Sequence, residues 1–235
     1  FDRQGAEFYG EGFIRREDMR PSESNPRYTN RFGTHAPALA EVDWRVNFIA
    51  LPTNNQDQAA AAQASGIYIG GHVSTLQLYA GNANGDPLVP DGNGGYTTSA
   101  AYQYIVVTQQ NGTTRRYRFG PDLILYERQG SNWINTGKTF NGVIFVNGRV
   151  DRFTGPARQP VNSNDPRRAP PALARFAQVT VAANNDIRIT GDLKYEDPPC
   201  TGVPTRLANG NVEPATCDNL DAVNVLGVYT QNGSI

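Results

Sequence analysis

In this sequence, the residues whose type and spacing best suit ligand binding are the arginines of one short segment. The run Arg115–Arg118 follows an Asn-Gly dipeptide and contains three arginines and Tyr117. In a strand, alternation puts Arg116 and Arg118 on one face and their neighbours on the other. Guanidinium groups on a solvent face hold phosphates, and nearby aromatic rings stack on nucleic-acid bases. The alternative is a solvated strand face whose Tyr117 belongs to the core.

Positive charge is concentrated in the middle of the chain. The whole chain has 21 basic and 22 acidic residues, but residues 101–175 hold 11 basic and 4 acidic residues, a net charge of +7. Residues 176–235 hold 3 basic and 7 acidic residues, a net charge of -4. A basic segment is the electrostatic footprint of nucleic-acid binding. The predicted DNA-binding residues are Arg115, Arg116, Tyr117, Arg118, Arg128, Arg149, Arg152, Arg158, Arg167, Arg168 and Arg175.

The sequence contains no motif typical of an enzyme active site. Its two histidines, His35 and His72, have neither metal-ligand spacing nor the Ser and Asp partners of a hydrolase. Adjacent carboxylates such as Glu196-Asp197 point to opposite faces of a strand, so they do not form a glycosidase pair. We therefore expect a non-catalytic module without cofactor or metal, and the alternative is a β-helical carbohydrate-active enzyme.

The only two cysteines, Cys200 and Cys217, bracket a stretch rich in Pro, Gly and Asn. A disulfide across a loop of this length stabilises a fold by about 3 kcal/mol in the chain-entropy model. Two unrelated thiols are the alternative, whereas a zinc site would need more ligands than lie nearby. The spacing predicts one disulfide and an oxidising compartment. No stretch approaches the roughly 18 apolar residues that span a bilayer, and no signal-peptide pattern opens the chain.

Many short strands are the expected elements, because apolar residues make up only 38% of the chain while Gly and Pro number 24 and 16. An N-cap and an Ala-rich run predict a single short helix over residues 56–64. Strands are predicted over 67–69 and 73–79. An Asn-Gly turn predicts a β-hairpin over 102–119, and a second strand pair follows over 123–135.

From residue 139, short β-branched strands alternate with Asn and Gly turns. Residues 140–150 form one such unit, 177–193 repeat strand, Asn-rich turn and strand, and 225–235 begin a third unit. Repetition of this kind is typical of stacked parallel rungs. The predicted fold is all-β, a parallel β-solenoid with added antiparallel hairpins and one short helix. It forms a single module over 1–235, irregular over 1–138 and clearest over 139–235, and both ends look cut from a larger protein.

The segments 141–148, 179–182, 185–195 and 224–227 resemble the rung series of large type IV pilin-like proteins. This resemblance implies a β-solenoid at the cell surface, exported through the periplasm, that receives DNA on a competence pilus during natural transformation. It further implies DNA and other pilins as partners. The apolar amino-terminal pilin helix is missing from the sequence, so neither pilus assembly nor a membrane contact follows. The alternative is a structural or adhesive pilus-tip module that binds a surface, a glycan or another pilin through loops such as 81–95.

Overall fold

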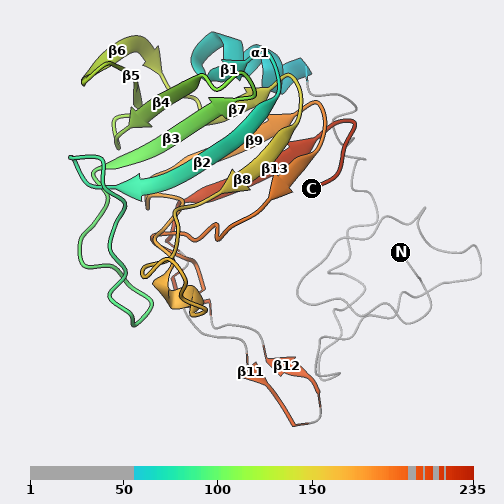
Figure 1. Cartoon of the computed structure of the whole chain (residues 1–235). Coiled ribbons are helices and arrows are strands. Elements are labelled where there is room, and N and C mark those ends of the chain that lie inside the picture. The colour runs from blue at the N-terminus through green and yellow to red at the C-terminus, as the bar shows by residue number, and fades with distance from the viewer. Residues whose placement is uncertain (1–55, 201–204, 209, 214–216, 220) are drawn as a thin grey trace, which may run out of the picture. The chain divides into compact units, whose positions relative to one another are not determined.

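The computed structural model describes residues 56–200, 205–208, 210–213, 217–219 and 221–235, which belong to the unit Thr53–Ile235. Helix α1 (Gln56–Ser65) precedes a series of short strands (Figure 1). The predicted helix is therefore confirmed. His35 and the other predictions made for residues 1–55 lie outside the described residues.

Four strands, all paired in parallel, form the first sheet in the order β1-β7-β9-β13. Their bounds are β1 (Ile67–Ile69), β7 (Val143–Val146), β9 (Gln178–Ala183) and β13 (Val225–Thr230). One face of this sheet enters the main core, and the other packs Phe145 and Ala182 against Ala62 of α1. Parallel strands covered on both faces need apolar residues on both faces. The uninterrupted apolar run of β7 meets that need.

The second sheet has seven strands in the order β10-β8-β2-β3-β4-β5-β6. The strands β2 (Val73–Gly81), β8 (Val150–Thr154) and β10 (Ile187–Ile189) pair in parallel. An antiparallel meander continues from β2 through β3 (Tyr102–Gln109), β4 (Thr114–Phe119), β5 (Ile124–Gln129) and β6 (Asn132–Thr139). Both predicted strand pairs are thus confirmed. Gly112, with φ 84°, provides the left-handed conformation that the β3–β4 turn requires.

The chain passes from the first sheet to the second through three short connections, or corners, that lie side by side. The chain passes from β1 to β2 through residues 70–72, from β7 to β8 through 147–149, and from β9 to β10 through 184–186. The Asn147 amide donates to the Ile69 carbonyl at 2.8 Å, and the Asn184 amide donates to the Val146 carbonyl at 3.1 Å. Gly148 fits its corner closely, because an added Cβ would lie 2.7 Å from Nδ1 of His72. Asn and Gly occupy these corners as the sequence predicted.

The predicted parallel β-solenoid is wrong. Parallel pairing joins the strands of residues 143–154, 178–189 and 225–230, but these strands divide between two open sheets, and the described residues form no closed solenoid. Two features prevent closure. Residues 155–177 return from the second sheet to the first with one 3-10 turn, η3 (Pro166–Arg168), and no strand. The antiparallel meander β3–β6 also extends the second sheet away from the stack (Figure 1).

A disulfide joins Cys200 to Cys217, as the sequence predicted. The short antiparallel pair β11 (Thr205–Arg206) and β12 (Val212–Glu213) lies between the two cysteines. This pair is a separate two-stranded sheet. Its closure by the disulfide removes conformational freedom mainly from the unfolded chain, which stabilises the fold by about 3 kcal/mol for a loop of this length.

A glutamine with no solvent exposure, Gln103, lies between the second sheet and the segment after η3. Nε2 of Gln103 donates to the carbonyls of Ala172 at 2.9 Å, Tyr104 at 3.0 Å and Tyr79 at 3.2 Å. Oε1 of the same side chain accepts the Ala174 amide at 2.8 Å. Gln103 therefore holds the irregular segment after η3 against the second sheet.

Replacing Gln103 with Leu tests this connection. The variant replaces the side-chain amide with a branched apolar group of comparable size, and the buried amide of Ala174 and the carbonyls near it lose the bonds to Gln103. We therefore expect the free energy of unfolding to fall by about 2–4 kcal/mol. Urea unfolding followed by circular dichroism measures the change. The control is Gln129→Leu at an exposed position of β5. Equal stability of the two variants would contradict the role assigned to Gln103.

Candidate functional site

The arginines nearest the Asn-Gly turn lie on the meander of the second sheet. Strand pairing puts Arg118 opposite Tyr104 of β3 and Tyr126 of β5, and it puts Arg128 opposite Trp133 of β6. Alternation along each strand brings these side chains to the same face of the sheet. This arginine–aromatic face comprises Tyr102, Tyr104, Arg116, Arg118, Tyr126, Arg128 and Trp133.

Arg118 is the centre of the arginine–aromatic face. Its guanidinium carbon lies 4.1 Å from the ring centre of Tyr102, 4.6 Å from that of Trp133 and 5.6 Å from that of Tyr126. The guanidinium of Arg128 lies 5.6 Å from the ring centre of Trp133. These cation–π contacts orient the positive groups without neutralising them. Nε of Arg118 is buried and has no hydrogen-bond partner among the described residues.

The aromatic rings of this face differ in exposure. Tyr104 is buried, stacks on Tyr79 at 4.8 Å between ring centres, and donates its hydroxyl to the Asn82 carbonyl at 2.8 Å. Tyr104 therefore lies beneath the more exposed side chains of this face. Trp133 and Tyr102 are half-buried, so part of each ring remains accessible to a ligand.

The face carries the positive charge of its arginines at neutral pH. Burial raises the pKa of Tyr79 to about 12, and the charges of Arg116 and Arg128 act in the opposite direction without restoring the ordinary value. The phenol therefore stays protonated. No ion pair joins Arg116, Arg118 or Arg128 to a carboxylate of the described residues.

Two of the predicted DNA-binding residues lie on the inner side of the meander. Tyr117 is buried in the core, so its ring is not available to a base. Arg115 is exposed on the same side, and its pKa is raised by a hydrogen bond with Tyr117. Glu127, which pairs with Tyr117 across the β4–β5 ladder, also lies on this side. The alternation predicted for Arg116 and Arg118 is present, and the core position of Tyr117 agrees with the alternative interpretation.

Carboxylates neutralise three of the predicted arginines. Nε of Arg149 lies 2.7 Å from Oδ1 of Asp151. Arg158 makes two hydrogen bonds to the carboxylate of Asp192, at 2.6 and 2.9 Å. Nη2 of Arg167 lies 3.0 Å from Oδ2 of Asp165. Three of the six predicted arginines after Arg128 are therefore neutralised by carboxylates and do not form a phosphate site.

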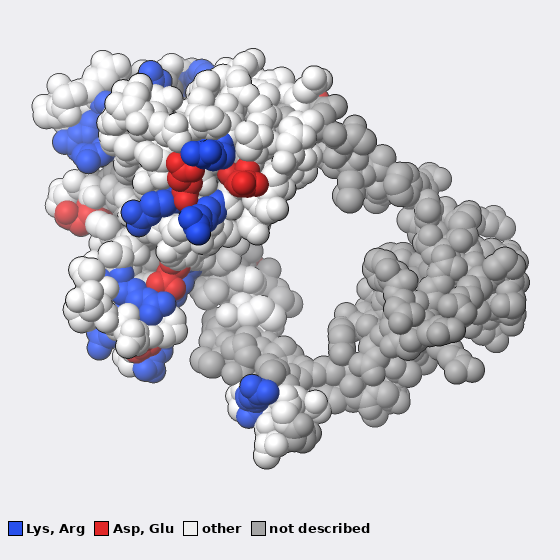
Figure 2. All heavy atoms as spheres, turned by 45° about the vertical axis from the view of Figure 1, so that its right-hand side comes forward, with Lys and Arg blue, Asp and Glu red and all other residues white. Residues whose placement is uncertain are grey.

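The other predicted arginines are exposed and dispersed. Arg152 lies on β8, Arg168 ends η3 beside Gly92, and Arg175 follows the segment that Gln103 holds. In the face of the molecule that Figure 2 shows, basic side chains form small groups with acidic side chains among them. The structure therefore brings Arg116, Arg118 and Arg128 together and leaves the remaining arginines apart.

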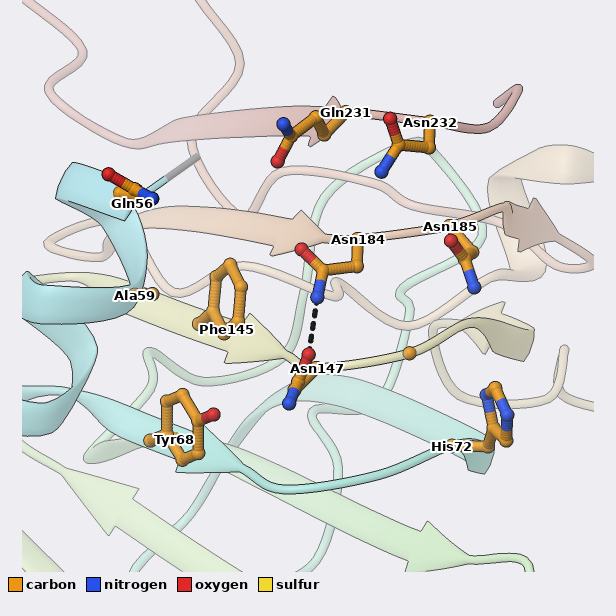
Figure 3. A pocket seen from close by; sticks show the side chains of 11 residues that line it. Gln56, Ala59, Tyr68, His72, Phe145, Asn147, Asn184, Asn185, Gln231 and Asn232 are labelled. Atoms are coloured by element: carbon orange, nitrogen blue, oxygen red, sulfur yellow. Dashed lines mark hydrogen bonds between the residues drawn. The ribbon is translucent and has the colours of Figure 1, made fainter. Parts of the chain in front are cut away.

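A second feature, which the sequence analysis did not single out as a site, is a hollow of about 520 Å³ at the corners between the sheets (Figure 3). Five of its six amide side chains come from the ends of stacked strands and the sixth from the start of α1, and Tyr68 and Phe145 form its wall beside that helix. The amides belong to Gln56, Asn147, Asn184, Asn185, Gln231 and Asn232. The recurrent Asn after each predicted rung was the signal that could have located this hollow.

His72 also borders the hollow, where it has a structural contact. Its Nδ1 accepts the backbone amide of Arg149 at 3.0 Å, which ties the first corner to the second. Among the described residues, no group of three or more His, Cys, Asp or Glu is arranged to hold a metal ion. In the same part of the chain, no helix is long and apolar enough to cross a membrane.

Comparisons with protein-family models, with curated proteins and with solved structures find no match to this chain. The resemblance to type IV pilin-like proteins consequently receives no support from them, and it rested on rungs that the structure divides between two sheets.

The ion pair between Arg158 and Asp192 generates a pH-dependent prediction. The hydrogen bonds from Arg158 lower the pKa of Asp192, so the charged carboxylate stabilises the fold above its unfolded pKa of about 3.9. That stabilisation is lost as the pH falls through the lower folded value. We expect Asp192→Asn to lower the Tm by about 2–4 °C at pH 7 and to have little effect well below pH 4.

Thermal unfolding at a series of pH values measures this difference. The matched control is Asp221→Asn, because Asp221 is an exposed carboxylate with no ion pair to a described residue. A Tm difference that persists unchanged to the lowest pH would show that the carboxylate charge of Asp192 is not its source.

Proposed function

We propose that this chain is a non-catalytic module that acts outside the cytoplasm and binds nucleic acid without sequence preference through the arginine–aromatic face. The observation that carries the proposal is the packing of Arg118 and Arg128 on Trp133, with Arg116 two residues before Arg118 on the same face and with no ion pair from these three arginines to a described carboxylate. Arginines elsewhere in the middle of the chain lack this combination.

The chemistry of the face favours single-stranded nucleic acid. Guanidinium groups contact phosphates along a backbone, and aromatic rings stack on bases that are not paired. In a duplex the base faces are hidden, so Trp133 and Tyr102 would have no stacking partner there. Recognition through phosphates and ring faces carries little sequence information, which is why we propose binding without sequence preference.

The disulfide supports a location in an oxidising compartment. A surface module that captures single-stranded DNA would suit uptake during natural transformation, with other pilins as neighbours, and this is the biological setting we propose. The competing proposal of an adhesive or structural module depends on a different surface, formed by loops such as 81–95.

Replacing Arg116 and Arg128 together with Gln tests the proposal. Arg118 is left intact because it packs on three rings and its loss would disturb the meander. For three phosphate contacts to a single strand, the log–log dependence of the affinity on salt has a slope of about -2. We expect the double variant to reduce the magnitude of that slope by about 1.4, because two contacts are lost.

Fluorescence anisotropy between about 50 and 200 mM salt measures the slope with a labelled strand longer than the roughly 4–16 nucleotides that such surfaces cover. The matched control replaces Arg149 and Arg167 with Gln, since both already pair with carboxylates. We expect this control to keep the wild-type slope. Absence of binding by the wild type at about 50 mM salt, or an equal loss in the control, would refute the proposal.

A further inference from the structure

The amide side chains of the hollow form two rows across the stacked corners. Asn147, Asn184 and Gln231 each follow the last paired residue of a strand in the first sheet, so the three occupy equivalent positions. Asn185 and Asn232 occupy the next positions after β9 and β13, level with Gly148 after β7. Because neighbouring strands lie about 4.8 Å apart, amides repeat at that spacing along each row.

The two rows differ in what their amides do for the fold. Nδ2 of Asn184 donates to Oδ1 of Asn147, and this bond links two corners within the first row (Figure 3). In the second row, the backbone amide of Asn185 donates to the Gly148 carbonyl at 3.0 Å, and that of Asn232 donates to the Asn184 carbonyl at 2.9 Å. The backbone therefore sets these corners, and the exposed side chains of Asn185 and Asn232 face solvent.

The lining of the hollow contains no permanent charge. None of its eleven residues, all of them described, is Asp, Glu, Lys or Arg. Six carry a primary amide, which offers two N–H donors and one carbonyl acceptor. A surface of this kind matches groups that both donate and accept hydrogen bonds, as sugar hydroxyls do, and it offers no counter-charge for a phosphate or a carboxylate.

An aromatic wall completes the hollow on the side of α1. The rings of Tyr68 and Phe145 stack at 5.6 Å between centres with an interplanar angle of 13°. Phe145 is buried and supports the pair, whereas Tyr68 is partly exposed and presents its ring and hydroxyl. Small-ligand sites combine ring surfaces with polar groups that fix the orientation of the ligand, and in this hollow the polar groups are the more numerous. The apolar C–H face of one pyranose packs on such a ring while the hydroxyls of the following sugars bond the amides.

We propose that this hollow binds a linear neutral oligosaccharide, with one sugar ring against Tyr68 and the hydroxyls of the following sugars on the amides of Asn185 and Asn232. The regular spacing of the rows suits a linear oligosaccharide that lies across the corners. This site is separate from the arginine–aromatic face, and it takes an uncharged ligand where that face takes a polyanion. The proposal therefore stands or falls independently of nucleic-acid binding.

Titration of the isotope-labelled protein with cellohexaose, maltohexaose and chitohexaose tests the proposal by nuclear magnetic resonance of the Asn and Gln side-chain amides. Each oligosaccharide is added to about 10 mM, where a site with a Kd of about 1 mM is about nine-tenths occupied. We expect at least one of them to shift the amide signals of Asn185 and Asn232. Replacing both residues with Ala is expected to weaken binding about tenfold or more while the fold is retained.

Two further variants make the test specific. Tyr68→Leu keeps an apolar residue beside α1 but removes the stacking surface, and it is expected to weaken binding as well. Asn162→Ala with Asn164→Ala, at exposed positions of the loop after β8, is the matched control and is expected to bind as the wild type does. Absence of shifts with all three oligosaccharides would overturn the proposal, and so would binding that survives the loss of Asn185 and Asn232.

Discussion

The register of three corners is the constraint on which the rest of this structure depends. At residues 70–72, 147–149 and 184–186 the chain leaves the first sheet and enters the second, and backbone hydrogen bonds join each corner to the next. A shift of one residue in any corner would move every side chain of the following strand to the opposite face. Val150 and Ile187, both buried, would then leave the core. The corners thus fix the direction of β2, and β2 is the strand on which the whole meander is built.

The same constraint separates two surfaces of different chemical character, one neutral and one cationic. At the corners, side chains project at the spacing of the strands, and amides are suited to this position because neighbours can bond one another without charge repulsion. On the meander, the strands run antiparallel, and cross-strand pairing sets an arginine beside an aromatic ring of the neighbouring strand. The ring and the guanidinium then form a cation–π contact. A neutral hollow and a cationic face therefore follow from parallel stacking in one place and antiparallel pairing in another.

Local elements were predictable from the sequence, and their assembly was not. The Asn-Gly turn identified the β3–β4 hairpin, and the Ala-rich run identified α1, because both depend on a few neighbouring residues. Closure depends on what lies between the strands. Residues 155–177 contain too many Pro and Ala residues to form the strands that would close a solenoid. Their path is set by long-range contacts such as the hydrogen bonds of buried Gln103, which no local sequence pattern predicts. The solenoid prediction failed for this reason.

A count of charges along a sequence is a poor guide to a binding surface when the carboxylates that neutralise it lie elsewhere in the chain. Asp192, which pairs with Arg158, belongs to the acidic last quarter, so the basic and acidic segments seen in the sequence partly cancel in space. Among the described residues, the arginines whose neighbours are aromatic rings are not neutralised in this way. Since rings orient a guanidinium without removing its charge, the side chains around Arg118 keep both their positive potential and a defined geometry. Aromatic neighbours, more than the number of arginines, distinguish this face from the other basic positions of the chain.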